Sequence, residues 1–442
     1  MDYNNDDDCP CTLNEVELFD PIDKQVILES SSETKYSPVS AITTEDGSFE
    51  FNVLGTTNEF IDLNDTELMI EAKVVNSNGG GNLTDIDDVA AVNNWAHSMF
   101  SDIKLQIGDK IVEGGEHMYP YKAYLVNLFT HSKESKSTQL QNCGWYKDTT
   151  GSMNLSTAAN KGYTKRKALI AKSETKQFSF PLLLDMMLQN KYLLPNTPMK
   201  LTLTRNKPEF QLLIHTAATE TNRAKGLKVI LQSATLFVRR VKALASFLET
   251  LENRLMLQNA QYPIQRSELK TFTIAKGLRS YTIQSLFSST IPKMVWIGFV
   301  RNDAYNGTYT QNPFNFKHFN VDSVMLSASS KTAHFEQYTP DFTKKMYARE
   351  YNALFKAMGL YNKSDSMDIT MEEFGDGYTF FAFNLTPDQH TSGHSQISRN
   401  GSIRLDLSFS TDTPVPINVI AMGIFDGRIQ ITKNRAVHCD WK

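Results

Sequence analysis

The sequence predicts an all-β protein with short helices, organised as two tandem β-sandwiches. Three observations lead to this fold class. Short runs of alternating apolar and polar residues recur along the chain, Gly-, Asn- and Pro-rich stretches separate them, and strands in the first half have counterparts about 200 residues later. Hydrophobic residues make up 40% and aromatic residues 11% of the 442 residues, which is enough for large cores and excludes a globally disordered chain.

The charge balance and the cysteine content exclude further classes of protein. Lys and Arg total 45 against 49 Asp and Glu, so binding to nucleic acid through bulk positive charge is not expected. The four cysteines, Cys9, Cys11, Cys143 and Cys439, are too few for a disulfide scaffold and suit a reducing compartment. The N-terminus is acidic where a signal peptide is basic, and no run reaches the ~20 apolar residues of a membrane span. We expect a soluble chain made in the cytosol.

The first half begins with a flexible acidic arm at residues 1–14. Two-residue alternation then predicts strands at Phe49–Val53, Leu68–Val75, Ile103–Ile107, Ile111–Val112, Phe178–Phe180, Met199–Thr204 and Val229–Val241. Gly108–Lys110 predicts a hairpin turn between two of them. Apolar residues at helical spacing predict helices at Tyr119–Phe129, Leu182–Leu188 and Ala243–Asn259. The polar segment 131–165, which contains Cys143 and Trp145, is predicted to be one long loop.

The second half has the same pattern of predicted strands separated by loops. Strands are predicted at Thr271–Ile274, Val295–Val300, Val321–Leu326, Tyr378–Leu385, Ile403–Phe409, Ile417–Phe425 and Arg428–Ile431, with a helix at Tyr347–Met358. The unbroken apolar run Val295–Val300 indicates burial on both faces, and Phe425–Arg428 indicates a hairpin turn. Asn302–Phe319 is predicted to be a loop whose five aromatic residues fit either a subunit interface or the underside of their own domain.

A duplication relates the two halves. Met199–Thr204 and Ile403–Ser408 share the order apolar, basic, Leu, polar, Leu, hydroxyl. The offset of about 200 residues is the size of a whole β-sandwich, not of a solenoid repeat. We therefore expect a first domain at 15–250, which includes the connecting helix, and a second at 251–442. Leu203 and Leu407 should be equivalent inward positions of two separate cores.

Several motifs carry a family resemblance. Ile291–Lys293 and Gly298–Val300 lead into Asn302–Gly307, Asn312–Phe316 follows, and earlier Leu182–Asp185 leads into Lys191–Pro195. Eight-stranded sandwiches of this kind are jelly rolls. Together these motifs resemble the double jelly-roll major capsid proteins of Polinton (Maverick) and adintovirus type elements, in the adenovirus hexon lineage. The resemblance runs from about Glu15 to Arg428 and is most specific between Ile291 and Val321.

The resemblance implies a structural protein rather than an enzyme. It implies a homotrimer with pseudo-hexagonal outline that contacts neighbouring capsid trimers, with penton and minor capsid proteins as further partners. Such trimers tile an icosahedral shell around double-stranded DNA, which they enclose without sequence-specific binding. The expected location is the virion, after synthesis in the host cytosol. The acidic arm at residues 1–14 is expected to lie on the inner side of the shell.

We expect no catalytic, cofactor-binding or metal-binding residues, although three sets were weighed. His390 and His394 stand four residues apart, but Gly393 and the Ser/Thr content around them predict a loop rather than a zinc-binding helix. Asp85, Asp87 and Asp88 would bind Ca²⁺ only if the preceding Gly-rich loop folded over them, so a solvated charge cluster is favoured. The glycines Gly79–Gly81 lack the Lys-Ser/Thr and the helix of a phosphate-binding loop.

Two basic runs were also considered. Lys165–Lys167 could face DNA or help nuclear entry, although a solvated loop is favoured, and Arg239, Arg240 and Lys242 could equally pair with carboxylates. The alternative function is a jelly-roll carbohydrate-binding protein or glycoside hydrolase. It would need convergent carboxylates at ~5–10 Å and exposed aromatic residues on one sheet face. The four Trp are instead spread along the chain.

Overall fold

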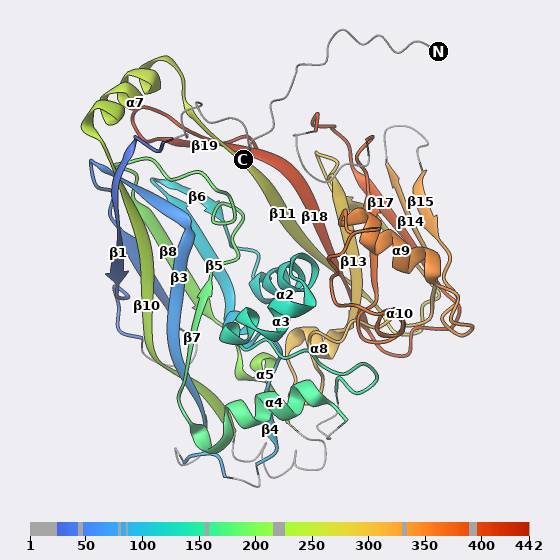
Figure 1. Cartoon of the computed structure of the whole chain (residues 1–442). Helices are drawn as coiled ribbons and strands as arrows, with labels where there is room; N and C mark the ends of the chain where they lie inside the picture. The colour runs from blue at the N-terminus through green and yellow to red at the C-terminus, as the bar shows by residue number, and fades with distance from the viewer. Residues whose placement is uncertain are drawn as a thin grey trace, which may run out of the picture.

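Two β-sandwiches stand side by side, with helices packed between and around them (Figure 1). The computed structural model describes residues 24–42, 47–77, 81–84, 87–154, 159–214, 226–328, 334–388 and 396–441. The acidic arm, Cys9 and Cys11 therefore lie outside the described residues. The all-β fold class with short helices is confirmed. Across the described ranges, no helix is both long and apolar enough to cross a membrane.

The first sandwich consists of two antiparallel sheets. One sheet has the strand order β1 (Leu28–Tyr36), β10 (Leu227–Ala243), β3 (Glu59–Asn76) and β7 (Lys176–Pro181). The other has the order β2 (Ser48–Val53), β8 (Met199–Arg205), β5 (Phe100–Ile107) and β6 (Lys110–Glu113). A short pair, β4 (Val89–Ala91) and β9 (Leu212–Ile214), lies at one end of this sandwich.

The second sandwich repeats the arrangement. Its first sheet has the order β11 (Ala260–Ile274), β18 (Ile417–Ile431), β13 (Met294–Arg301) and β16 (Phe380–Asn384), and β19 (Val437–Cys439) also pairs with β18. Its other sheet has the order β12 (Ser280–Phe287), β17 (Ile403–Phe409), β14 (Val321–Ala328) and β15 (His334–Tyr338). Matched by sheet position, β2, β8, β5 and β6 correspond to β12, β17, β14 and β15. The other two sheets correspond in the same way, which confirms the duplication.

The helices gather mainly between the sandwiches and around their ends (Figure 1). Those between β4 and β9 are α1 (Trp95–Ser98), α2 (Tyr119–Thr130), α3 (Lys133–Ser137), η1 (Gln139–Cys143), α4 (Lys161–Leu169), η2 (Ala171–Ser173) and α5 (Pro208–Gln211). Those after β10 are α7 (Ala245–Leu257), α8 (Asn302–Asn306), α9 (Ala348–Ala357) and α10 (Met371–Gly375). The expected division at residues 250 and 251 falls within α7 and stays a prediction.

Strand β13 shows why one predicted strand has no polar face. Val295, Ile297 and Phe299 point into the core of the second sandwich, whereas Met294 and Trp296 belong to the cluster shared with the first sandwich. The sheet is therefore covered on both sides at β13, and its central strands are buried there, β13 from Met294 to Val300 and β18 from Ile417 to Phe425. The predicted burial of this strand on both faces is confirmed.

The segment 131–165 is not one long loop, and that prediction is wrong. It contains α3, η1 and the beginning of α4. Ser132 caps α3 by accepting a hydrogen bond from the Ser135 amide, and Asn160 caps α4 by accepting one from the Tyr163 amide. The polar residues that suggested a loop are thus partly helix caps.

Two further predictions of local structure are wrong. Residues 182–188 form turns rather than a helix, with the Met187 and Leu188 amides both donating to the Leu184 carbonyl at 2.9 and 3.1 Å. The expected hairpin turn at Phe425–Arg428 is also missing from the described chain, because β18 runs straight through it. Asp426 lies opposite Gln265 of β11, so pairing with a long neighbouring strand overrides the turn signal.

Candidate functional site

The described residues that sequence reasoning considered for chemistry are mostly engaged in structural contacts. Arg239 pairs with Asp65 at 2.6 Å, and Lys242 pairs with Glu29 at 3.1 Å. Arg240 lies 3.5 Å from Glu59 and donates to the Tyr36 hydroxyl at 2.5 Å. The interpretation of this run as carboxylate partners is therefore confirmed.

Of the acidic and histidine sets, the structure describes only Asp87 and Asp88, and these two carboxylates have different partners. Asp87 accepts hydrogen bonds from the amide and hydroxyl of Thr84, and Asp88 pairs with Lys167 at 2.8 Å. Asp85, His390 and His394 lie outside the described residues. Within the described ranges, no three His, Cys, Asp or Glu side chains lie close enough to hold a metal ion.

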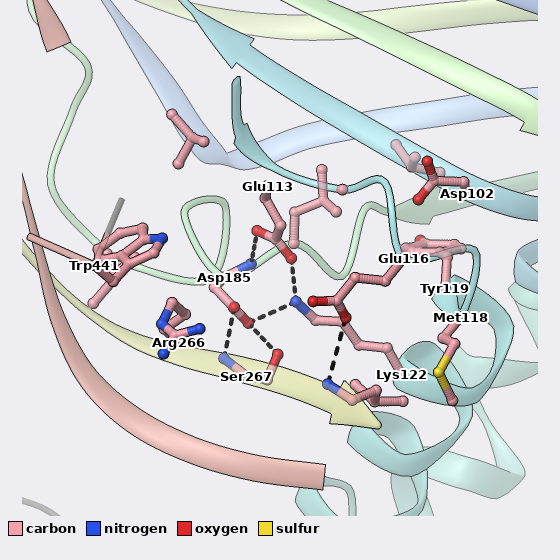
Figure 2. Close-up of a pocket in the computed structure, with 16 residues that line it drawn as sticks. Asp102, Glu113, Glu116, Met118, Tyr119, Lys122, Asp185, Arg266, Ser267 and Trp441 are labelled. Carbon is pink, nitrogen blue, oxygen red and sulfur yellow. Dashed lines mark hydrogen bonds and ion pairs between the residues drawn. The ribbon is translucent and has the colours of Figure 1, made fainter. Parts of the chain in front are cut away.

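Several buried polar contacts lie where the two sandwiches meet, a region that we call the junction. Figure 2 shows its first network, in which Lys122 of α2 points at two carboxylates. Lys122 pairs with Asp185 at 2.7 Å and also with Glu113 at the end of β6. Asp185 in turn accepts hydrogen bonds from the Ser267 amide and hydroxyl, both at 2.8 Å, on β11 of the second jelly roll. The network therefore connects the two halves.

The charges of this first network do not balance. Two carboxylates share one ammonium group, and all three side chains are at most 15% exposed. Burial and the nearby Asp185 carboxylate raise the pKa of Glu113 to about 7, although Lys122 opposes the shift. Burial disfavours the ammonium form of Lys122, but Asp185 and Glu113 outweigh it and raise its pKa above the usual value. Lys122 therefore stays charged, and Glu113 is the group that can take up a proton near neutrality.

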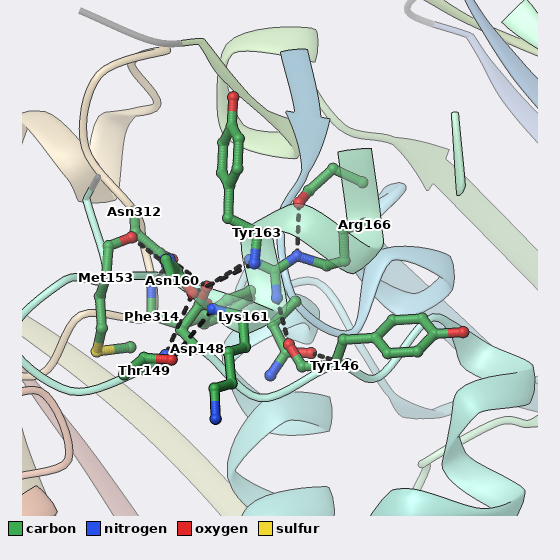
Figure 3. A network of polar contacts seen from close by, with 12 residues as sticks. Tyr146, Asp148, Thr149, Met153, Asn160, Lys161, Tyr163, Arg166, Asn312 and Phe314 are labelled. Atoms are coloured by element: carbon green, nitrogen blue, oxygen red, sulfur yellow. Dashed lines mark hydrogen bonds and ion pairs between the residues drawn. The ribbon is translucent and has the colours of Figure 1, made fainter. Parts of the chain in front are cut away.

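A second network surrounds Arg166 (Figure 3). The Arg166 side chain is fully buried in α4, donates to the Ala91 carbonyl at 2.7 Å and pairs with Asp148 at 2.5 Å. Asn312 of the second half donates to the other Asp148 oxygen at 2.9 Å. Gly162 permits this approach, because a Cβ there would lie 2.4 Å from the Lys147 carbonyl oxygen.

The position of Arg166 corrects an expectation. The run Lys165–Lys167 is not a solvated loop, and its central residue is not available to DNA or to a nuclear-import receptor. Lys165 remains exposed, whereas Lys167 is occupied by Asp88. The Arg166 guanidinium instead forms a buried ion pair. Removing one partner of such a pair strongly destabilises the folded protein.

A third set of contacts joins residues 136–150 to residues 367–376. Lys136 donates to the carbonyls of Leu128 and Met367, and Lys147 pairs with Glu373 at 2.8 Å. Burial and the neighbouring Lys147 lower the pKa of Lys136 to about 7, against the opposing effect of Asp368. Part of the segment predicted as a long loop thus connects the first half of the chain to the second half across the junction.

Aromatic side chains fill the apolar centre of the junction. Tyr124 of α2 stacks on Phe314 of the second half with ring centroids 4.1 Å apart and an interplanar angle of 4°. Phe316 packs on Phe380 with centroids 4.5 Å apart, and Phe314 and Phe316 are both fully buried. Phe314 and Phe316 are therefore buried within the chain and not available to a subunit interface, although Phe314 packs against the first half rather than only beneath its own domain.

Sequence reasoning did not identify the junction residues, although one signal was present. Lys122 lies in α2, where nearly every other side chain is apolar or aromatic and buried. A lone Lys in such a helix is expected to have a buried carboxylate partner. The partner could not be named, because Glu113 and Asp185 come from separate segments of the chain.

No family model matches the chain. An uncharacterized protein of Caenorhabditis elegans is 26% identical over 400 residues, which cover 88% of this chain and 92% of that protein. The alignment with this relative therefore spans nearly the whole of both sequences.

Solved structures of viral proteins share the fold. A chain of the Sputnik virophage cryo-EM structure superposes with a TM-score of 0.61 at 12% identity, covering 98% of this chain and 92% of that chain. The Faustovirus major capsid protein gives 0.56 at 11% identity, covering 95% and 93%. The mavirus major capsid protein gives 0.51 at 11% identity, covering 98% and 95%. The chain therefore has the double jelly-roll fold seen in viral major capsid proteins, and both sandwiches take part in the match.

Proposed function

We propose that this chain is a major capsid protein of the Polinton (Maverick) and adintovirus type. The observation that carries the proposal is the end-to-end match to the Faustovirus and mavirus major capsid proteins, which includes both jelly rolls. The molecule acts by assembly rather than by catalysis. Its proposed domains are residues 15–250 and 251–442, with residues 1–14 as an arm.

The proposed unit of assembly is a homotrimer of about 150 kDa, from three chains of 50.0 kDa. Two similar sandwiches per chain give six around a threefold axis, and hence a pseudo-hexagonal outline. The junction supports this role, because buried ion pairs, hydrogen bonds and aromatic contacts connect the two sandwiches of one chain. An obligate interface between subunits, such as the one proposed between the chains of this trimer, buries upwards of ~2,000 Å².

The partners follow from the same proposal. They are neighbouring trimers, penton proteins and minor capsid proteins, in an icosahedral shell that encloses double-stranded DNA without reading its sequence. The proposed location is the virion, after synthesis in the host cytosol. The formal net charge of -4 agrees with a shell that does not bind DNA through bulk positive charge.

The carbohydrate-binding or glycosidase alternative is not favoured. Trp95, Trp145 and Trp296 are all at most 5% exposed, so they cannot form a sugar-binding platform on a sheet face. Glu113 and Asp185, two of the carboxylates that line the cleft beside α2, are paired with Lys122.

Light scattering on the purified full chain at micromolar concentration tests the proposal. We expect a single species of about 150 kDa, and negative-stain images should show particles with a hexagonal outline. A stable, monodisperse species of 50 kDa with native circular dichroism would contradict the capsid function. Circular dichroism on the same sample distinguishes a folded monomer from an unfolded chain.

A further inference from the structure

A basic cleft lies between helices α3 and α4 of the first jelly roll. Five lysines line this cleft together with Asp368, and they are Lys133, Lys136, Lys147, Lys161 and Lys165. The whole chain, in contrast, has a formal net charge of -4. The positive charge of the cleft is therefore a local concentration and not part of a general excess, and such a concentration attracts anions.

Each of the two helices contributes a pair of lysines. Lys133 and Lys136 stand three residues apart on α3, and Lys161 and Lys165 stand four residues apart on α4. Side chains at these spacings are neighbours on a helix, and like charges there repel each other. Lys147 comes from the chain between the two helices. The fold thus gathers like charges that a bound anion would stabilise.

Most of this charge has no acidic partner within the chain. Lys147 pairs with Glu373 at 2.8 Å and lies 3.5 Å from Asp368. The other four lysines form no ion pair with any residue that the structure describes. Lys136 is only 4% exposed, yet its ammonium group donates to two backbone carbonyls instead of a carboxylate. Because buried lysines are normally paired with an acidic group, the cleft is short of negative charge.

The beginning of α4 adds partial positive charge to the cleft. Lys161 and Gly162 are the first residues of this helix, and both line the cleft. The first turn of α4 has no acidic residue, although acidic residues there would stabilise the helix. Lys161, labelled in Figure 3, extends away from the buried Asp148 network. The helix end and its lysines therefore both favour an anion at this place.

The size of the cleft indicates a compact ligand. Its volume is about 170 Å³, which is below the about 300–1,000 Å³ of pockets for drug-sized molecules. Lysine ammonium groups bind phosphate oxygens through charge-assisted hydrogen bonds. Several phosphates in one small molecule could contact both helices at once. The phosphates of a DNA duplex lie along the outside of a stiff rod, so they cannot converge in a cleft of this size.

We propose that this cleft binds a small polyphosphate anion. The ammonium groups of Lys133, Lys161 and Lys165, which are exposed, donate hydrogen bonds to its phosphate oxygens. Lys136 and Lys147 lie deeper and contribute mainly through their charge. Because the anion contacts α3 and α4 together, it binds only the folded arrangement and stabilises it. This inference does not depend on the capsid function.

Isothermal titration calorimetry of the full-length protein tests the proposal, with inorganic tripolyphosphate as the probe at neutral pH and low salt. Lys161→Gln/Lys165→Gln removes the pair on α4 and should weaken binding at least about tenfold, because two charge-assisted hydrogen bonds are lost. Lys133→Gln on α3 should weaken it about fivefold. The matched control is Lys276→Gln/Lys363→Gln, which makes the same change in net charge at exposed lysines outside the cleft. We expect the control to change the affinity less than about twofold.

Two further ligands separate a specific site from general attraction of anions. Sulfate at the same ionic strength should bind at least about tenfold more weakly than tripolyphosphate, because one small anion cannot contact both helices. A short DNA duplex should bind weakly and equally to the wild-type protein and the Lys161→Gln/Lys165→Gln variant.

Four results would overturn the proposal. The first is the absence of saturable tripolyphosphate binding to the wild-type protein, and the second is an equal loss of affinity in the control pair. The third is an equal affinity for sulfate. The fourth is a DNA duplex whose affinity falls with the α4 pair, which would assign the cleft to nucleic acid. Circular dichroism checks that each variant is folded, and Lys133→Gln decides the matter if the double variant is not.

Discussion

Leu203 and Leu407 occupy the same position in two separate cores. Leu203 lies on β8 opposite Ile103 of β5, and Leu407 lies on β17 opposite Val324 of β14. Both side chains point inward, at 0% and 3% exposure, and they belong to different hydrophobic clusters. The predicted equivalence is confirmed, since β8 and β17 hold corresponding places in corresponding sheets.

This equivalence predicts matched effects of substitution. Leu203→Asp and Leu407→Asp each bury an unpaired carboxylate and remove core packing, so each should lower the free energy of unfolding by at least about 3 kcal/mol. Thr202→Ser is the control, because Thr202 alternates with the buried residues and should change stability by less than about 0.5 kcal/mol. Urea unfolding measures all three. A tolerated Asp at either leucine would contradict the placement.

The buried Arg166 should be far more sensitive than an exposed arginine. Arg166→Ala leaves Asp148 buried without its cation and should cost about 3–5 kcal/mol. Arg239→Ala removes an ion pair whose side chains are 44% and 53% exposed, and should cost at most about 1 kcal/mol. Thermal unfolding of both variants is the measurement. Similar losses of stability in the two variants would show that the buried Arg166–Asp148 pair contributes no more to stability than an exposed ion pair.

Glu113 should make stability depend on pH in the acidic range. Its pKa is raised from 4.5 to about 7, so between these values the folded chain binds more protons than the unfolded chain. The stabilisation is fully present below pH 4.5 and is lost as the pH rises through 7, with a total on the order of 3 kcal/mol. Glu113→Gln should flatten this slope, whereas the exposed Glu249→Gln should retain it. Urea unfolding between pH 4.5 and 7.5 tests the difference.

Lys136 should produce the opposite slope at higher pH. Its pKa is lowered from 10.5 to about 7, so the unfolded chain binds more protons between these values and stability should increase with pH. Lys136→Met should remove that increase, whereas Lys133→Met on the exposed side of α3 should keep it. Unfolding is compared from pH 7 to 9.5. A slope that persists in Lys136→Met would assign it to another group.

Much of the fold could be predicted because its signals are local. The alternation in Met199–Arg205 and Ile403–Phe409 predicts two half-buried strands, and the apolar run at Val295–Val300 predicts burial on both faces. The boundaries were less accurate where distant residues decide them. Asp426 and Gly427 are common turn residues, yet they continue a strand because β11 pairs along its full length.

The junction was much less predictable than the strands. The sequence places Lys122 in a helix and Asp185 after an apolar run, but it does not bring them together. Similarly, Arg166 stands in a basic run of the kind that is usually solvated. Its burial depends on Asp148 and on the Asn312 amide, which lies more than 100 residues away.

The sequence by itself determined the fold class, the duplication and most strand positions, because two-residue periodicity is set by the backbone and needs only neighbouring residues. The tertiary structure decided which charges are buried and which segments cross the junction. Those outcomes depend on desolvation and pairing between residues such as Lys122 and Asp185, whose energies exist only once the two jelly rolls are packed together.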